Sequence, residues 1–356
     1  MVLQQGILAG LTVVEIAHPY TEYAGCVLAG LGADVLLVEP PAGAQTRHRL
    51  PRMPGAKSDS SRASMDFLTR NVNKKSAVID PLQASDQQLL SDLCNRADIV
   101  LDAAPSTYHE LVSNSEPQTR VTITDAKGLG TAPVVGFAAS GGLASSGWPH
   151  QPPCNAPGWF ALDGASVYAA SVALIGTVAR QRGAAPLHYE IPYEEAVVAA
   201  ITPWTRPLHS YGRDAVGQGT ITARMGPGGF PIYPTQDGYV RVLIATPRHW
   251  DAFVQMLDEP EDLVSGPWAD PLFRRDNLDV MQIMCDELPK HYPTDTLLQK
   301  GQKLGLTITP VASLYDFHDD PHFRARVLFV DIEDAEFGKM EILRPPTVFG
   351  EAELQC

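Results

Sequence analysis

The stretch Leu11–Glu39, LTVVEIAHPYTEYAGCVLAGLGADVLLVE, decides the fold of this chain. Its first part, Leu11–Ile16, is a run of apolar and β-branched residues and predicts a strand. The small residues of Tyr20–Gly30 predict a helix that ends in glycines, and Ala33–Glu39 predicts a second strand. Because short connections join the two strands through a helix, we expect them to be parallel strands of one sheet.

The same alternation continues toward the middle of the chain. Further strands are predicted at Ser76–Asp80, Asp98–Asp102 and Thr119–Thr124, and helices at Ser85–Asn95 and Gly164–Gln181. Strands that alternate with helices are typical of an α/β fold in which helices cover both faces of a parallel sheet. With 356 residues, the chain is also long enough for a second domain.

The composition changes after Ala200, which indicates where a second domain begins. Residues Thr202–Pro234 are rich in Gly, Pro, Arg and Thr and are interpreted as a linker. Beyond it we predict a strand at Tyr239–Ile244 and helices at His249–Leu257, Met281–Glu287 and Thr294–Leu304, the last with Thr294 as its N-cap. The tail predicts a β-hairpin of Phe329–Asp331 and Lys339–Leu343 that turns at Glu336–Gly338.

Charge and cysteine content exclude several classes of protein. The chain has 41 acidic and 27 basic residues and a formal net charge of −14, which argues against a nucleic-acid or anionic membrane surface. Five cysteines without CxxC spacing exclude a zinc site built on cysteine pairs and fit reduced thiols. Met1–Leu11 does not resemble a signal peptide, and the apolar stretch Gly164–Ala179 is short for a bilayer span. We therefore expect a cytoplasmic protein that holds no metal ion.

A dinucleotide-binding site is considered first and rejected. Gly30 and Gly32 lie close to a strand that ends at Glu39, the kind of acid that binds a ribose. In the dinucleotide fingerprint, however, the glycines follow the strand and open the helix. Here they follow the helix and precede the strand, which is typical of a helix C-terminus.

Two residues are candidates for chemistry. His18 follows the first predicted strand, at the sheet edge where ligands bind in open α/β folds, although an ordinary polar loop residue also fits there. Asp163 lies immediately before the helix predicted from Gly164, where it is either a plain N-cap or an ionised carboxylate nucleophile. As an N-cap it would accept backbone N–H groups, and the positive end of the helix would keep it charged.

Glycine and basic clusters point to ligand binding. The glycine cluster at 226–229, which includes Gly228 and Gly229, is either an ordinary turn or a lid whose N–H groups approach a reacting oxyanion. One basic cluster lies at Arg47–Arg52 and another at Arg70–Ser76. Both are either solvated surface or, in so acidic a chain, places for the phosphates of a ligand.

Several blocks of the sequence resemble those of the class III CoA-transferase family, which includes formyl-CoA transferase and the carnitine CoA-transferases. These blocks are LTVVE and ADVLLVEPP near the N-terminus, NVNKKSA at 71–77, ADIV at 97–100, the segment from ASGG at 139–142 to Asp163, TQDGYV at 235–240 and DPHFRAR at 320–326. Their order along most of the chain makes the resemblance far more specific than any single block.

The resemblance implies a fold and an assembly. Members of the family combine their N- and C-terminal segments in one Rossmann-like domain and place the middle of the chain in a small domain. For this chain, the resemblance implies a discontinuous CoA-binding domain of residues 1–200 and 315–356. It also implies a linker with the glycine loop at 201–234, and a small α+β domain at 235–314. Two such chains would interlock as a homodimer.

The resemblance also implies a mechanism. Asp163 would attack an acyl-CoA thioester, form a mixed anhydride and then an aspartyl-CoA thioester, and pass CoA to a carboxylic acid acceptor. The implied catalytic residues are Asp163, His18, Gly228 and Gly229, with the glycine loop excluding water from the intermediates. Contacts to coenzyme A are expected from Tyr20, Glu39, Arg47, Asn71, Lys74, Lys75 and Ala103.

Departures from the family pattern leave two alternatives. The family's E-N-F block is Asp102-Ala103-Ala104 here, which removes two usual CoA contacts, and Tyr20 stands where formyl-CoA transferases have glutamine. Their glutamate is Val134 here, so transfer between oxalate and formate is not expected. An acyl-CoA racemase is one alternative, but Val134–Ala138 lacks the histidine of that branch's R-A-G-H-D segment, and His150 comes later. A non-catalytic protein of the same fold is the other alternative.

Overall fold

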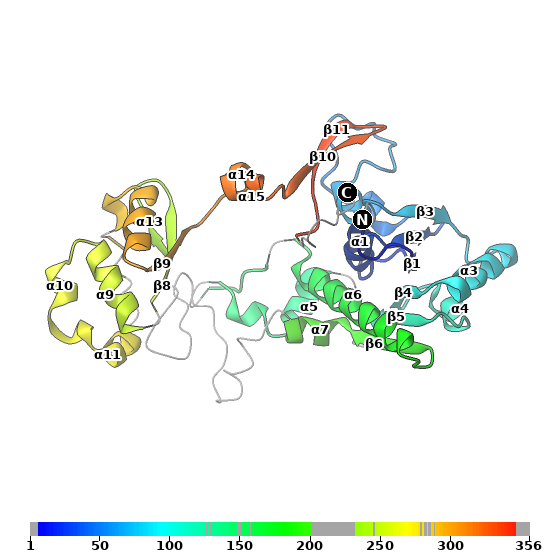
Figure 1. Ribbon diagram of the computed structural model, residues 1–356, viewed down its shortest axis with the longest axis horizontal. Coiled ribbons are helices and arrows are strands. Elements are labelled where there is room, and N and C mark those ends of the chain that lie inside the picture. The colour runs from blue at the N-terminus through cyan, green and yellow to red at the C-terminus, as the bar shows by residue number, and fades with distance from the viewer. Residues whose placement is uncertain are drawn as a thin grey trace. The chain divides into compact units, whose positions relative to one another are not determined.

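The computed structural model describes residues 6–346 apart from 126, 129, 131, 148–150, 157, 201–231, 245, 278–279, 281–282, 284–285 and 288. Most of its helices and strands are labelled in Figure 1. The chain divides into two compact units, and each is described by itself. One contains Met1–Leu143, Asn155–Asp214 and Pro321–Cys356, and the other contains Ala144–Cys154 and Ala215–Asp320. The first unit is therefore assembled from separate parts of the sequence.

A six-stranded parallel sheet forms the centre of the first unit. Its strands are β1 (Thr12–Ile16), β2 (Asp34–Glu39), β3 (Lys75–Val78), β4 (Ile99–Ala104), β5 (Thr119–Thr124) and β6 (Leu187–Pro192). They lie in the order β3-β2-β1-β4-β5-β6, which is typical of doubly wound α/β folds. All five pairings are parallel. The prediction of an α/β fold with a parallel sheet is thus confirmed.

Helices pack on both faces of this sheet. They are α1 (Glu22–Gly30), α2 (Met65–Arg70), α3 (Ala84–Arg96), α4 (His109–Ser113), α5 (Pro133–Ala139), α6 (Phe160–Gln181) and α7 (Tyr193–Ala200), with the 3-10 turn η1 (Gln45–His48). The 3-10 turn η2 (Leu143–Ser145) lies where the chain passes from the first unit to the second. Neighbouring residues of β1 point to opposite faces, as strand geometry requires. Val13 belongs to a core with α1, α5, α6 and α7, whereas Val14 belongs to a core with α3 and α4. His18 follows the carboxyl end of β1.

Helix α6 begins one turn earlier than predicted. Its first residue is Phe160 and its N-cap position is Trp159, so Asp163 lies inside the first turn. The N–H of Asp163 donates to the Trp159 carbonyl at 2.8 Å. The N-cap role predicted for Asp163 is therefore wrong. Because Ala161 and Leu162 are buried in the core, starting the helix at Phe160 places two more side chains against the sheet.

Within the part of the chain that the structure describes, α6 is the one helix long and apolar enough to cross a membrane. The helix has 22 residues, six more than the apolar stretch Gly164–Ala179 to which the sequence-based expectation applied. Its small residues are nevertheless packed in the core, and at Gly176 an added Cβ would lie 2.5 Å from Thr119 Cγ2. Such close approach to β5 is typical of a core helix in an α/β domain.

The second unit contains a three-stranded antiparallel sheet of β7 (Ile232–Pro234), β8 (Tyr239–Leu243) and β9 (Thr307–Pro310), with β8 in the middle. Its helices are α9 (Pro247–Met256), α10 (Glu261–Val264), α11 (Pro271–Asp276), α13 (Thr294–Lys303) and α14 (Leu314–Asp319), with 3-10 turns η3 (Gly266–Ala269) and η4 (Pro289–His291). Tyr233 and Phe253 stack in its core with ring centroids 5.4 Å apart. The predicted strand at 239–244 and helices at 249–257 and 294–304 are confirmed to within two residues. The helix predicted at Met281–Glu287 lies mostly outside the described residues.

Thr294 does not have the predicted N-cap role. It is the first residue of α13, and the cap position is occupied by Pro293, which makes no side-chain cap hydrogen bond. The Thr294 hydroxyl instead donates to Asp237 Oδ1 at 2.7 Å, and the same oxygen accepts the Thr294 N–H at 2.8 Å. Asp237 thus ties the turn between β7 and β8 to the start of α13.

The C-terminal segment of the first unit is a hairpin, as predicted. After the short helix α15 (Pro321–Ala325), strands β10 (Phe329–Asp334) and β11 (Gly338–Leu343) pair antiparallel. Gly338 has φ +71°, a conformation that glycine adopts without strain. Asp334 accepts a 2.5 Å hydrogen bond from Arg62, which connects this hairpin to the N-terminal part of the same unit.

Candidate active site

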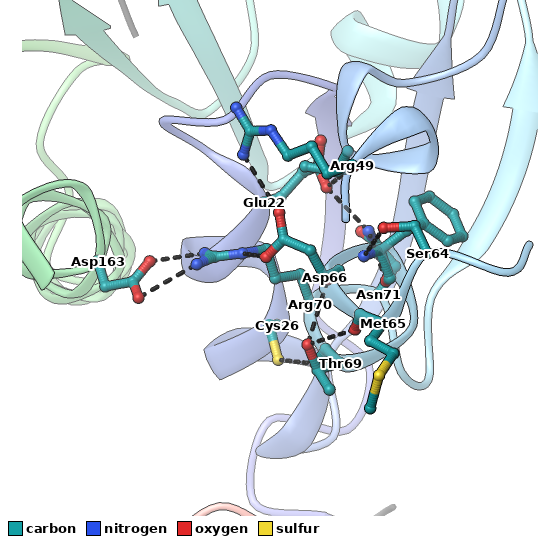
Figure 2. A network of polar contacts seen from close by, with 12 residues as sticks. Glu22, Cys26, Arg49, Ser64, Met65, Asp66, Thr69, Arg70, Asn71 and Asp163 are labelled. Carbon is teal, nitrogen blue, oxygen red and sulfur yellow. Dashed lines mark hydrogen bonds and ion pairs between the residues drawn. The ribbon is translucent and has the colours of Figure 1, made fainter. Parts of the chain in front are cut away.

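The predicted nucleophile Asp163 is paired with Arg70 (Figure 2). Arg70 Nη1 donates to Asp163 Oδ1 at 2.6 Å, and Nη2 donates to Oδ2 at 3.2 Å. The first turn of α6 presents the carboxylate, and the last residue of α2 supplies the guanidinium. The Asp163 side chain is 30% exposed and that of Arg70 is 8% exposed. A partly accessible carboxylate is therefore held by a buried cation.

Asp66 binds Arg70 from the other side. Arg70 Nε donates to Asp66 Oδ1 at 2.6 Å, and Arg49 Nη1 donates to Asp66 Oδ2 at 3.2 Å. The four residues Asp163, Arg70, Asp66 and Arg49 form a row of alternating charge, which we call the charge cluster. With both carboxylates ionised, its formal charges sum to zero.

Aromatic rings lie against both arginines. The Trp159 ring centroid is 3.5 Å from Arg49 Cζ and 5.7 Å from Arg70 Cζ, and that of Tyr23 is 5.5 Å from Arg70 Cζ. Guanidinium groups stack favourably on aromatic faces. Because Trp159 directly precedes α6, one short segment positions both this ring and Asp163.

The local sequence explains how α2 presents Arg70. Ser64 caps the helix, since its hydroxyl accepts the Phe67 N–H at 3.3 Å. Asp66 lies in the first turn, where the helix dipole favours an acid, and Arg70 lies four residues later on the same side. Phe67 is buried and anchors the helix to the unit. Because Asp66 holds Arg70 through Nε, the two Nη atoms of the guanidinium remain available for a second partner.

Burial and Arg70 act in opposite directions on Asp163. Burial raises the pKa of the Asp163 carboxyl above its ordinary value, against the hydrogen bonds and charge of Arg70. Although burial alone would lower it, the bonds to Asp163 and Asp66 raise the pKa of Arg70. Arg70, and not the helix cap expected from the sequence, is thus the group that favours the ionised form of Asp163.

His18 lies beside the charge cluster in its neutral form. Burial lowers the pKa of His18 to about 4, and the charge of Arg49 acts in the same direction. Its Nδ1 accepts the Tyr20 N–H at 3.3 Å, which assigns the ring proton to Nε2. Arg49 therefore links the two predicted catalytic side chains. It belongs to the charge cluster that contains Asp163, and its charge helps to lower the pKa of His18.

Two residues predicted to contact CoA, Glu39 and Arg47, bind each other. Arg47 Nε donates to Glu39 Oε2 at 2.6 Å, and Nη2 donates to Oε1 at 2.7 Å. Glu39 also accepts the Ser76 hydroxyl and the Ala44 N–H at 2.5 and 2.8 Å. The Arg47 guanidinium lies 3.7 Å from the centroid of the Phe67 ring. Glu39 is enclosed by protein groups and orients Arg47.

Lys74 and Asn71 belong to a buried polar network. Lys74 Nζ lies 2.8 Å from Glu15 Oε2 and donates to the Glu22 carbonyl at 2.7 Å and to Asn71 Oδ1 at 2.8 Å. Asn71 Nδ2 in turn donates to Glu22 Oε2 at 2.9 Å. The Lys74 side chain is 1% exposed. An ammonium with three internal partners contacts a phosphate only if it leaves one of them.

A cavity of about 630 Å³ lies within the first unit, and four predicted CoA residues line it: Arg47, Asn71, Lys74 and Lys75. Its other walls come from α2, from the loop that contains Arg62 and from the β10–β11 hairpin. The Lys75 side chain is 70% exposed and pairs with Asp34 at 2.8 Å. Because α2 lines this cavity up to Thr69 and ends at Arg70, it connects the cavity with the partner of Asp163.

The other two residues predicted to contact CoA, Tyr20 and Ala103, are buried in the core. The Tyr20 hydroxyl donates to the Gly130 carbonyl at 3.0 Å, and its ring stacks on Tyr193 with centroids 5.0 Å apart. Ala103 lies in β4. Neither is among the residues that line the cavity. Because both residues are almost completely buried, their side chains are not exposed to a ligand such as CoA.

Some predicted features fall outside the described residues, namely Gly228, Gly229 and His150. Among the residues whose placement is described, no group of three or more His, Cys, Asp or Glu is arranged to hold a metal ion. The stretch Val134–Ala138, which the sequence analysis compared with the racemase segment, lies within helix α5.

Sequence analysis considered Arg70 only as part of a basic cluster for phosphates, and it assigned no site role to Asp66 or Trp159. The four-residue spacing of Asp66 and Arg70 is a signal for an ion pair on one helix side. The bond from Arg70 to Asp163 spans 93 residues, and no local pattern predicts it. A tryptophan just before a helix likewise carries no signal of a stacked arginine.

The fold and the site together define an α/β protein with a candidate carboxylate nucleophile. The sequence profile of CoA-transferase family III matches residues 8–116 and 125–356. The chain belongs to this family, and the resemblance noted from the sequence is confirmed.

Known relatives and structures agree with this family. The probable CoA-transferase Rv1866 of Mycobacterium tuberculosis is 32% identical over 326 residues, 86% of this chain, and the chain spans 40% of the length of that protein. The formyl-CoA:oxalate CoA-transferase of Streptomyces avermitilis is 22% identical over 370 residues, which cover 95% of this chain and 88% of that protein. The crystal structure of a CAIB/BAIF family protein from Brucella suis has a TM-score of 0.79 at 21% identity, covering 99% of this chain and 95% of that one. This last likeness concerns the fold.

Proposed function

We propose that this protein transfers CoA from an acyl-CoA donor to a carboxylic acid acceptor, with Asp163 as the nucleophile. The observation that carries the proposal is the partly exposed Asp163 carboxylate, held by Arg70 at the start of α6. Relatives named for formyl-CoA and oxalate, for succinyl-CoA and (R)-benzylsuccinate, and for succinate and glutarate support the class of reaction.

A carboxylate can carry out the whole exchange. An oxygen of Asp163 attacks the thioester carbonyl, the acyl–sulfur bond breaks, and CoA leaves as the thiolate. The thiolate then attacks Cγ of the mixed anhydride and releases the donor acid, which leaves an aspartyl-CoA thioester. An acceptor carboxylate reverses these two steps and regenerates Asp163. One difficult exchange is thus split into easier steps.

The cavity lined by Arg47 and Lys75 is the proposed place for CoA phosphates, because it gathers basic side chains in a chain of net charge −14. Neutral His18 offers Nε2–H as a hydrogen-bond donor beside the charge cluster. The loop with Gly228 and Gly229 is proposed to cover the intermediates, and the active form is proposed to be a homodimer.

Covalent trapping tests the nucleophile. The protein is incubated with formyl-CoA, acetyl-CoA or succinyl-CoA, treated with hydroxylamine or borohydride, and analysed by peptide mass spectrometry. We expect modification at Asp163, and Asp163→Ala to remove it and to lower turnover at least about 10³-fold. Asp66→Asn, which changes the other carboxylate on Arg70, should leave the modification at Asp163.

Two results would speak for other functions. Turnover that persists in Asp163→Ala would disprove the assignment of the nucleophile. Deuterium uptake at the acyl α-carbon in the absence of an acceptor acid would indicate a racemase or isomerase instead.

A further inference from the structure

Arg70 is held in place independently of Asp163. Its Nε donates to Asp66 at 2.6 Å, and its ring neighbours are Tyr23 and Trp159. Both Nη atoms point to Asp163 (Figure 2). If the negative charge of Asp163 were removed, the guanidinium would therefore stay where it is, with its donors still directed at the reacting carboxyl group.

The proposed reaction removes that charge. An anhydride or a thioester of Asp163 is neutral, so the charge cluster then contains Arg49 and Arg70 against Asp66 alone. A guanidinium that is 8% exposed and has lost one of its two carboxylate partners is costly in free energy. The covalent intermediate therefore favours the entry of another anion beside Arg70.

We propose that Arg70 binds the carboxylate of the acid substrates at the moment when Asp163 is acylated. This inference rests on the proposed CoA transfer and identifies the residue that recognises its acid partners. The departing donor acid pairs with Arg70 as it is released, and the acceptor acid then takes its place. A planar guanidinium suits this exchange because its fixed donors can hold the reacting carboxyl group and a second carboxylate at the same time.

The two hydrogen bonds from Arg70 to Asp163 differ in length, and this difference indicates which oxygen of Asp163 attacks the donor and which donor group of Arg70 becomes available to the acid. Nη1 holds Oδ1 at 2.6 Å, whereas Nη2 holds Oδ2 at 3.2 Å. Oδ2, the less tightly bound oxygen, attacks the donor, while Oδ1 stays on Nη1 as the carbonyl oxygen of the intermediate. Nη2 is then available to the acid.

The second half of the exchange balances without a proton. An oxygen of the ionised acceptor attacks Cγ of the aspartyl-CoA thioester, the Cγ–sulfur bond breaks, and its electron pair leaves with the CoA thiolate. The thiolate then attacks the acceptor's acyl carbon, and the bond from that carbon to the bridging oxygen of the anhydride breaks. The bridging oxygen stays on Cγ and becomes a carboxylate oxygen of Asp163. Asp163 regains its charge and displaces the product from Arg70.

A neutral replacement of Asp163 tests this idea without any acyl-CoA. Asp163→Asn keeps the shape of the side chain and removes its charge, as acylation does. Calorimetry in Hepes of low ionic strength without chloride measures the binding of formate, oxalate, succinate, L-malate and benzoate. We expect Asp163→Asn to bind at least one of them at least about tenfold more tightly than the unmodified protein, and added salt to weaken the binding.

Paired second substitutions locate the binding group. Arg70→Gln in the Asp163→Asn protein should abolish the gain in affinity. Arg49→Gln in the same protein removes an equal charge from the charge cluster but no donor to residue 163, and should keep most of the gain. If none of the five acids gains affinity, or if the gain survives Arg70→Gln, the inference is wrong.

Kinetics provides a second test that does not depend on the Asp163→Asn protein being folded. In Arg70→Lys, a donor identified by trapping should still modify Asp163, while the KM for the acceptor rises at least about tenfold because a point charge replaces the fork. An unchanged acceptor KM would overturn the inference. Trapping that fails in the unmodified protein refutes the proposed transfer, whereas trapping that succeeds without carboxylate binding by Asp163→Asn refutes the role of Arg70 alone.

Discussion

The basic segment 70–75 contains three cations with different environments. Arg70 is buried and binds Asp163, Lys74 is buried and lies against Glu15, and Lys75 is exposed on the surface. Buried cations are tolerated in proteins when acids pair with them. A cluster that suggests one phosphate site in the sequence is therefore divided among a candidate catalytic group, a structural ion pair and a surface charge.

Lys74 and Lys75 are adjacent in sequence but differ in burial, so substitutions at the two positions can be compared to measure how much the buried network stabilises the fold. Lys74→Met leaves the buried Glu15 without its cation, and we expect the free energy of unfolding to fall by about 3–5 kcal/mol. Lys75→Met breaks an exposed pair with Asp34, and the change should stay within about 1 kcal/mol. Urea denaturation at pH 8 measures both. Equal losses in the two variants would contradict the burial of Lys74.

The same network determines the sign of a pH dependence. Burial raises the pKa of Glu15 to about 7 in the folded protein, although Lys74 opposes the shift. The folded state therefore keeps a proton that the unfolded chain releases near its ordinary pKa of 4.5. The contribution of Glu15 to stability is thus fully present below pH 4.5 and is lost as the pH rises through 7. Lys74→Met removes the group that lowers this pKa, so the loss should extend to higher pH when urea denaturation is repeated over a range of pH.

At the scale of elements, α1 and β1 are packed closely around this network. A Cβ built on Gly25 of α1 would overlap the Glu15 carboxylate of β1, lying 2.5 Å from its Cδ. The absence of a side chain at Gly25 therefore makes room for a buried acid that Lys74 holds in place. This contact decides how closely the helix approaches the strand.

Gly25→Ala tests the contact between α1 and β1. Overpacking costs about 1–3 kcal/mol, and alanine gains about 1 kcal/mol over glycine in a helix interior. We expect a net loss of about 1–2 kcal/mol because Glu15 is tied to Lys74. Thermal unfolding measures this loss in Gly25→Ala, in Glu15→Ala and in the double variant. If the overlap is the cause, Gly25→Ala should not destabilise further once Glu15 is shortened.

The interior strands that the sequence analysis located are more deeply buried than the edge strand β6 that it missed. The interior strands β1, β2, β4 and β5 consist mainly of apolar or β-branched residues with one or two charged residues each, and each was predicted to within two residues. Strand β6 was missed because it lies at the edge of the sheet and alternates polar and apolar residues in only six positions. The start of α6 was misplaced because Asp163-Gly164 resembles a cap, while the burial of Ala161 and Leu162 extends the helix.

The candidate site was predictable to a smaller extent than the sheet. Position after a strand singled out His18, and the family blocks singled out Asp163. The charge cluster depends on contacts between α2 and α6, which no pattern within either segment encodes. The same holds for the cavity, because the β10–β11 hairpin, far along the chain, supplies one of its walls.

At the scale of the molecule, each of the two units has a hydrophobic core of its own. The first core joins β1, β4 and β5 to α1 and α6, and the second joins β7, β8 and β9 to α9 and α13. The first unit is discontinuous, since its hairpin follows the second unit in sequence. A cut between the units therefore removes the hairpin from the first unit and a wall from its cavity.

The second unit provides the last prediction, which concerns independent folding. A fragment of residues 232–320 contains all three strands of its sheet and the buried side chains of Tyr233, Phe253, Leu297 and Ile308. Because this core is complete within the fragment, we expect it to unfold cooperatively on heating and to give dispersed amide signals in NMR spectra.

A shorter fragment is the control for this prediction. Residues 232–293 lack α13 and β9, so that β8 loses the antiparallel partner that pairs with Val240 to Leu243. The core also loses Leu297 and Ile308, and a single pair of strands is marginally stable in water. We therefore expect the shorter fragment to remain unfolded. Cooperative unfolding in both fragments would show that α13 and β9 are dispensable, and its absence in both would show that the second unit needs the rest of the chain.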